Sequence, residues 1–123
     1  MSNLYRKVGE MNYDGLISDL TPRTEVRGGT IAALKAETVL KRGTVLAKNA
    51  DGKLIVLGSG EGTAHSILCD DTTVGVSDVD TAVYTAGCFD FDKVTVADDY
   101  TMTAEDLDTL RKYGIVFKNV SDI

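Results

Sequence analysis

The chain has 123 residues, of which 43% are hydrophobic and 26% charged, and its formal net charge is -6. This length suits one domain with a single modest core. The acidic balance argues against binding to nucleic acid or to a membrane surface, because both attract a basic face. The sequence shows no window long and apolar enough for a membrane span and no signal peptide, so we expect synthesis in the cytoplasm.

Residues 1–22 are expected to form an extended N-terminal arm. Their apolar side chains follow no sustained period of 2 or 3.6, and glycines interrupt any helix. The segment is also too apolar for a solvated tail, so we expect it to bind a partner surface. The predicted anchors are Met11, Tyr13, Leu16, Ile17 and Leu20. The alternative is that the arm packs on its own domain.

Residues 23–123 are expected to form a β-rich domain. The predicted strands are Thr30 to Ala36, Thr44 to Lys48, Lys53 to Leu57, Ser66 to Cys69, Asp80 to Phe91 and Ile115 to Phe117. Asp51-Gly52 tolerates positive φ, which favours a hairpin between the second and third of these strands. The parity of the apolar residues slips near Asp92-Lys93, which predicts a bend or bulge there.

One helix is predicted between Thr103 and Gly114. Thr103 suits the N-cap, and Asp106 stands where a capping box needs an acceptor. Ala104, Leu107 and Leu110 form an apolar stripe, and Gly114 suits the C-terminal stop. The predicted fold class is therefore mainly β with one short C-terminal helix, a small α+β body of β-barrel-like form behind the N-terminal arm.

The cysteines and the single histidine do not indicate catalysis. Cys69 and Cys88 are too few for a disulfide framework, so we expect reduced core residues, with one disulfide as the alternative. His65, Ser66 and Cys69 lie on one short strand, which cannot fold them into a triad. The spaced glycines Gly58, Gly60 and Gly62 match no phosphate-binding motif and are interpreted as a mobile connection.

Three acidic pairs stand out: Asp70-Asp71, Asp90 with Asp92, and Asp98-Asp99. None has the spacing of a calcium-binding loop, so we interpret them as solvated turns and as edge charges that discourage aggregation. We expect no catalytic, metal-binding or cofactor-binding residue, and no enzymatic activity. An enzyme would have to depend on acids such as Asp70, Asp71 or Asp90.

Five short elements follow one another along the body in a recognisable order. They are Gly43-Thr44-Val45-Leu46-Ala47, Asp51-Gly52-Lys53-Leu54-Ile55-Val56, Thr63-Ala64-His65-Ser66-Ile67-Leu68-Cys69-Asp70, Ala82-Val83-Tyr84-Thr85-Ala86-Gly87-Cys88-Phe89-Asp90 and Leu110-Arg111-Lys112-Tyr113-Gly114-Ile115. Together they resemble the lambda-type head decoration proteins of tailed bacteriophages, over roughly residues 40–117.

The resemblance implies a non-enzymatic structural protein of the virion with a β-tadpole type of fold. It implies homotrimers at threefold positions on the outer capsid surface, made in the host cytoplasm and bound to the major capsid protein. It implies no cofactor and no direct contact with nucleic acid or membrane. The alternative is a cellular β-rich module that binds a ligand or glycan, which would be a monomer with a concave polar site.

Overall fold

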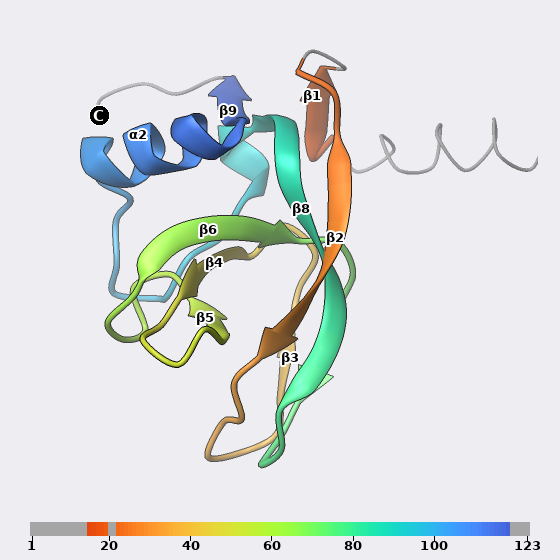
Figure 1. The fold of residues 1–123 in the computed structure, drawn as a ribbon, viewed down its shortest axis with the longest axis vertical. Helices are drawn as coiled ribbons and strands as arrows, with labels where there is room; N and C mark the ends of the chain where they lie inside the picture. The colour runs from red at the N-terminus through yellow and green to blue at the C-terminus, as the bar shows by residue number, and fades with distance from the viewer. Residues whose placement is uncertain (1–14, 20–21, 119–123) are drawn as a thin grey trace, which may run out of the picture.

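A computed structural model gives the structure of residues 15–19 and 22–118. The elements in chain order are β1 (Ile17–Asp19), β2 (Glu25–Ile31), β3 (Thr38–Leu40), β4 (Val45–Lys48), β5 (Leu54–Val56), β6 (Thr63–Leu68), β7 (Thr72–Val74), β8 (Val79–Asp90), the 3-10 turn η1 (Phe91–Lys93), α2 (Ala104–Tyr113) and β9 (Ile115–Lys118). This part of the chain is mainly β with one short helix near its C-terminal end, which confirms the predicted class (Figure 1).

The long strand β8 organises the sheet. Along most of its length it pairs antiparallel with β2, from Ile31 opposite Val79 to Glu25 opposite Ala86. Its middle residues also pair with β6, and its last residues pair antiparallel with β1 and parallel with β9. Figure 1 shows β8 running along most of the molecule. The strand predicted from Asp80 to Phe91 is thus confirmed, with ends shifted by one residue.

Five strands close into a small barrel. β4 pairs with both β5 and β6, β6 pairs with β8, and β8 pairs with β2. The ring closes where Ile31 of β2 pairs with Leu54 of β5. The amide of Ala32 donates a hydrogen bond of 2.9 Å to the carbonyl of Leu54 at the same place. The barrel-like body is therefore confirmed, and one pair of residues completes it.

The hairpin of β4 and β5 is held by its turn. The side-chain oxygen of Asn49 accepts hydrogen bonds from the amides of Asp51 and Lys53, each 3.0 Å long. Gly52 has a φ of 79°, in the left-handed region that glycine adopts without a steric penalty. The turn confirms the predicted hairpin and sets the register in which Leu46 pairs with Val56.

Apolar side chains are buried on both faces of the barrel strands. Each of the five strands contributes one residue to one core cluster: Ile31, Leu46, Leu54, Leu68 and Val83. Neighbouring residues of the same strands, such as Val45, Ile67 and Tyr84, belong to a second cluster. That cluster also includes residues of β1, α2 and β9. Strands buried on both faces form continuous apolar runs rather than an alternation, as in Val45-Leu46-Ala47.

The predicted bounds of two strands are wrong. The strand expected over Thr30 to Ala36 lies instead at Glu25–Ile31, because the backbone leaves the sheet after Ile31. Its exposed, glycine-containing sequence has little strand propensity of its own, and pairing with β8 determines its conformation. The strand expected to begin at Ser66 begins at Thr63. Sequence analysis also missed β3 and β7, which form a separate sheet of two three-residue strands.

The slip in parity after β8 is a 3-10 turn rather than a bulge within a strand. The carboxylate of Asp90 accepts a hydrogen bond of 2.9 Å from the amide of Asp92 and caps η1. The turn redirects the chain, so that the apolar residues Val94 and Val96 pack against the second cluster from outside the barrel.

The predicted ends of α2 are confirmed. The Thr103 hydroxyl accepts a hydrogen bond from the Asp106 amide, and the Asp106 carboxylate accepts one from the Thr103 amide, at 3.1 and 3.0 Å. Gly114 ends the helix with a φ of 102°. Leu110 is fully buried beneath the helix, whereas Ala104, expected on the same apolar stripe, is exposed.

Replacing Thr103 by alanine should lower the free energy of unfolding by about 1 kcal/mol, because it removes one half of the capping box. Thr101→Ala is the matched control, since Thr101 is exposed and precedes the helix. Urea denaturation of the two variants measures the difference. Equal stability of both variants would contradict a role for the capping box.

Candidate functional site

The outer edge of β2 has almost no strand partner in the sheet. One edge of β2 pairs with β8 along all seven residues. On the other edge only Ile31 pairs with a described strand, so the edge from Glu25 to Thr30 has no strand partner within residues 15–19 and 22–118. We call this stretch the open edge. The upper half of β2 lies at the right margin of the molecule (Figure 1).

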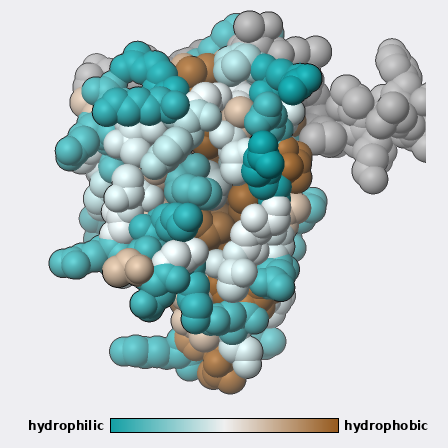
Figure 2. All heavy atoms as spheres, viewed as in Figure 1, coloured by the Kyte–Doolittle hydropathy of each residue, from teal (hydrophilic) through white to brown (hydrophobic). Residues whose placement is uncertain are grey.

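Side chains leave room for another strand along the open edge. Val26 is 52% exposed, and it is one of four large hydrophobic side chains exposed by half or more among the described residues. A Cβ added to Gly28 would meet no atom within 4 Å. Hydrophilic residues cover most of the face shown in Figure 2, and the hydrophobic areas on it are small and separate. The open edge therefore combines free backbone groups with a small exposed apolar surface.

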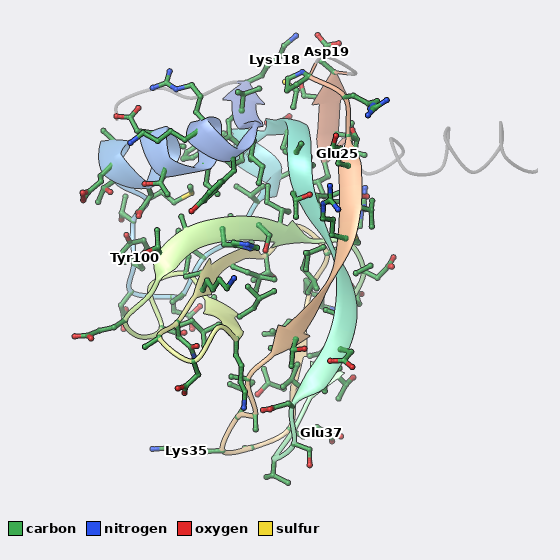
Figure 3. The ribbon with its side chains drawn as sticks, in the orientation of Figure 1. Asp19, Glu25, Lys35, Glu37, Tyr100 and Lys118 are labelled. Atoms are coloured by element: carbon green, nitrogen blue, oxygen red, sulfur yellow. The ribbon has the colours of Figure 1, made fainter. Side chains whose placement is uncertain are left out.

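The short strand β1 precedes the open edge and is anchored in the core. Leu16 and Ile17 are only 1% and 6% exposed, and both belong to the second core cluster. The amide of Asp90 donates a hydrogen bond of 2.8 Å to the carbonyl of Leu16. Asp19 and Lys118 of β9 form an ion pair of 2.9 Å, seen at the top of Figure 3. Both side chains are about half exposed, so this pair adds little stability.

The structure describes two of the five predicted arm anchors. Leu16 and Ile17 lie in the core of the domain, as expected if this part of the arm packs on its own domain. Met11, Tyr13 and Leu20 lie outside the described residues. The packed body thus includes residues on the N-terminal side of the boundary predicted at residue 22. Binding of a capsid by any of the five stays a prediction.

A polar cleft lies close to the open edge. Its walls are Glu25 and Arg27 of β2, His65 of β6, Thr85 of β8 and Tyr113 of α2, and its volume is about 330 Å³. The rings of His65 and Tyr113 are 5.9 Å apart. Nδ1 of His65 and Oγ1 of Thr85 are buried without a hydrogen-bond partner among the described residues. Sequence analysis did not find this cleft, because its walls come from four separate elements.

Burial lowers the pKa of His65 below its ordinary value of 6.5, and the nearby charge of Lys48 lowers it further. His65 is therefore mostly neutral at pH 7, and it lies in the barrel strand β6 as a half-buried residue. Its neighbour Ser66 is fully buried, with a hydroxyl that has no described partner. This arrangement offers no activated nucleophile, because the buried hydroxyl is out of reach of a substrate.

Both cysteines are free and buried, as predicted for reduced core residues. Burial raises the pKa of the Cys69 thiol to about 12, and it also raises the pKa of Cys88. Because the thiolate is the reactive form, neither cysteine is a nucleophile near neutral pH. Their role in this structure is to fill the core.

Two of the three acidic pairs take part in internal contacts. Asp71 forms an ion pair with Lys41 and accepts a hydrogen bond from the Arg42 amide. Asp90 caps η1 by accepting from Asp92. Within the described ranges, no group of three or more His, Cys, Asp or Glu side chains is placed to hold a metal ion. No helix in those ranges is long and apolar enough to cross a membrane.

Fold and surface together define a small β-barrel protein with an open strand edge near its N-terminal segment and a polar cleft beside that edge. A family model described as Bacteriophage lambda head decoration protein D matches residues 7–115. The chain therefore belongs to this family, as its sequence resemblance predicted, and is a structural protein of the phage capsid exterior. A search of curated proteins found no match.

Shortening Leu16 or Ile17 to alanine should lower the free energy of unfolding by about 2–5 kcal/mol, because each change leaves a cavity in the core. The matched control is Val26→Ala on the exposed edge, which should change stability by no more than about 0.5 kcal/mol. Urea denaturation measures all three. Loss of less than 1 kcal/mol for both core variants, roughly the cost of one buried methylene, would argue that β1 is not part of the body.

Stability should fall as the pH drops below 6.5 because of His65. Its pKa is lower in the folded chain than in the unfolded chain, so the unfolded state takes up the proton first. His65→Gln should remove this part of the pH dependence. The measurement is the free energy of unfolding of both proteins at about pH 8 and about pH 5.5, above the range of ordinary carboxylates. If the free energy of unfolding fell by the same amount between these two pH values in both proteins, the lowered pKa of His65 would be contradicted.

Proposed function

We propose that this protein binds the major capsid protein on the outside of a phage head through its N-terminal segment, residues 1–14, together with the open edge of β2. In this proposal it acts as a homotrimer at threefold positions and stabilises the shell against internal pressure. The observation that carries the proposal is the family match, which begins at Lys7 and so includes much of this segment.

The open edge supports binding by strand addition. An extended segment of a partner protein can pair with exposed backbone groups and complete a sheet. Glu25–Thr30 offers such groups over six residues. The N-terminal segment enters the body through β1, which pairs with β8, the strand that also holds β2. The residues that follow the N-terminal segment and the open edge therefore pair with the same strand.

Charge supports the outer face of the capsid as the site of binding. The chain carries 19 acidic and 13 basic residues, so it would be repelled by the packaged DNA inside the shell. Synthesis in the host cytoplasm agrees with two buried free thiols and no disulfide in the described structure.

Trimerisation supports tight binding without a large contact for each subunit. Three linked N-terminal segments bind a lattice far more strongly than one, because the second and third binding events become intramolecular. Binding of the folded form to the lattice also stabilises it by mass action. A barrel closed by one residue pair would benefit from such support.

Removing residues 1–14 tests the proposal. A chain that begins at Gly15 keeps Leu16 and Ile17 in the core and should remain folded, but it should lose binding to expanded capsids that lack the protein. Co-sedimentation with those capsids measures binding, and urea denaturation checks the fold. A chain that begins at Thr24 would be a poor test, because it also loses two core side chains.

Point variants refine the experiment. Met11→Ser and Tyr13→Ser should each weaken capsid binding by about tenfold or more if these side chains are anchors. Asn12→Ser is the matched control from the same segment and should bind as the full-length protein does. Undiminished binding of the chain that begins at Gly15 would overturn the proposed role of the segment.

A further inference from the structure

The open edge of β2 carries different side chains on the two faces of the sheet. Glu25 and Arg27 line the polar cleft on one face, so Val26 and Gly28 lie on the other. Glu25 is 4.0 Å from Arg27 and 3.5 Å from Arg23, and all three side chains are well exposed, so these contacts add little stability. A strand added here would meet two opposite charges on one face and a valine beside a glycine on the other.

This pattern is complementary to a second copy of itself. If two open edges pair antiparallel with Val26 opposite Val26 of the partner, Glu25 of each copy lies opposite Arg27 of the other. On the other face the two Val26 side chains contact each other. Gly28 leaves room for them, since a Cβ added there would meet no atom within 4 Å. Opposite charges and β-branched side chains placed across from each other both stabilise antiparallel strands.

The other registers of the same pair are less favourable. Residues directly opposite each other must lie on the same face of the sheet, so each allowed register centres on one residue that meets its own copy. Centring on Glu25 or on Arg27 places like charges opposite each other, which destabilises a strand pair. Centring on Gly28 places Glu25 opposite Ile31, which already has a strand partner. The charges therefore select the register centred on Val26.

We infer that two copies of the free protein pair along their open edges in this register and form a dimer with twofold symmetry. A twofold contact uses the same surface on both copies, so a self-complementary edge suffices. Pairing of one short strand buries little surface, so the dimer is weak and reversible. It also covers backbone groups that would otherwise invite aggregation.

The dimer competes with the coat protein for the open edge, and this part of the inference rests on the proposed function. An edge that is paired with a second copy cannot accept a strand from the coat protein. On a capsid the weak dimer gives way, because binding through several linked segments outweighs a single weak contact. The free protein thus keeps its edge covered until a capsid is present.

A disulfide at the centre of the register tests the dimer in the full-length chain. Cα atoms of directly opposed strand residues are about 4.5–5.5 Å apart, within the range of a disulfide. Val26→Cys should therefore form linked dimers under mild oxidation, while the native cysteines are buried. Val76→Cys is the matched control, because Val76 is more exposed, 79% against 52%, but lies outside β2. Non-reducing electrophoresis should show dimers of Val26→Cys at least about tenfold faster.

Charge exchange with rescue tests the register. Glu25→Arg and Arg27→Glu should each raise the dissociation constant of the dimer by about tenfold, because two attractive pairs become repulsive. A chain with both changes should recover most of the loss. Lys35→Glu and Glu37→Lys are the matched controls, since both residues are exposed and lie at the far end of the molecule from Glu25 (Figure 3). Sedimentation velocity measures the assembly state, and thermal unfolding checks that each variant is folded.

Three results would overturn the dimer. The first is a wild-type chain without dimers at concentrations up to about 1 mM. The second is linkage of Val26→Cys no faster than that of Val76→Cys, and the third is failure of the combined charge exchange to recover. None of these results bears on capsid binding by residues 1–14, which co-sedimentation measures separately.

Capsids test the competition. The disulfide-linked dimer of Val26→Cys should bind expanded capsids less than the same protein after reduction. Equal binding by the linked and reduced forms would overturn the competition and leave the dimer standing. Absence of binding by both the reduced variant and the wild-type chain would instead contradict the proposed function, without affecting the dimer.

Discussion

The pairing of β8 on both of its edges is the constraint on which the rest of the structure depends. Tyr84 pairs with Val26 on one side and Ile67 on the other, and Phe89 pairs in the same way with Ile17 and Phe117. Successive residues of β8 are buried as well, since Val83 and Tyr84 are each 1% exposed. One strand therefore fixes the barrel, the short β1 and the strand that follows the helix, and it contributes Thr85 to the polar cleft beside the open edge.

The elements whose ends or turns are determined by neighbouring residues could be predicted from the sequence. The hairpin follows from its Asn49–Lys53 turn, and α2 from a capping box at one end and a glycine at the other. β8 and β9 have enough apolar residues to be recognised alone. β2 lacks such a signal, because five of its residues before Ile31 are polar or glycine and it is held by β8. β3 and β7 are three-residue strands that exist only through each other.

The candidate site was predictable only in part, for a related reason. Apolar character indicates that a side chain is buried, but it does not say whether the chain's own core or another protein buries it. Leu16 and Ile17 are buried in the chain's own core. The polar cleft combines residues from Glu25 to Tyr113, and no spacing along the sequence relates them. The family resemblance could be recognised because it depends on short sequence elements in a fixed order, which requires no knowledge of surfaces.

The barrel closes between β2 and β5 through the pair Ile31 and Leu54. Every other contact between neighbouring barrel strands involves two or more residue pairs, whereas this one rests on a single pair and one adjoining hydrogen bond. The local opening that breaks the fewest strand pairs therefore separates β2 from β5 and leaves the pairing of β2 with β8 intact. An opening of this kind would lengthen the free backbone of β2 by continuing the open edge through Ile31. The domain can thus widen the strand edge it presents while the framework that positions it stays folded.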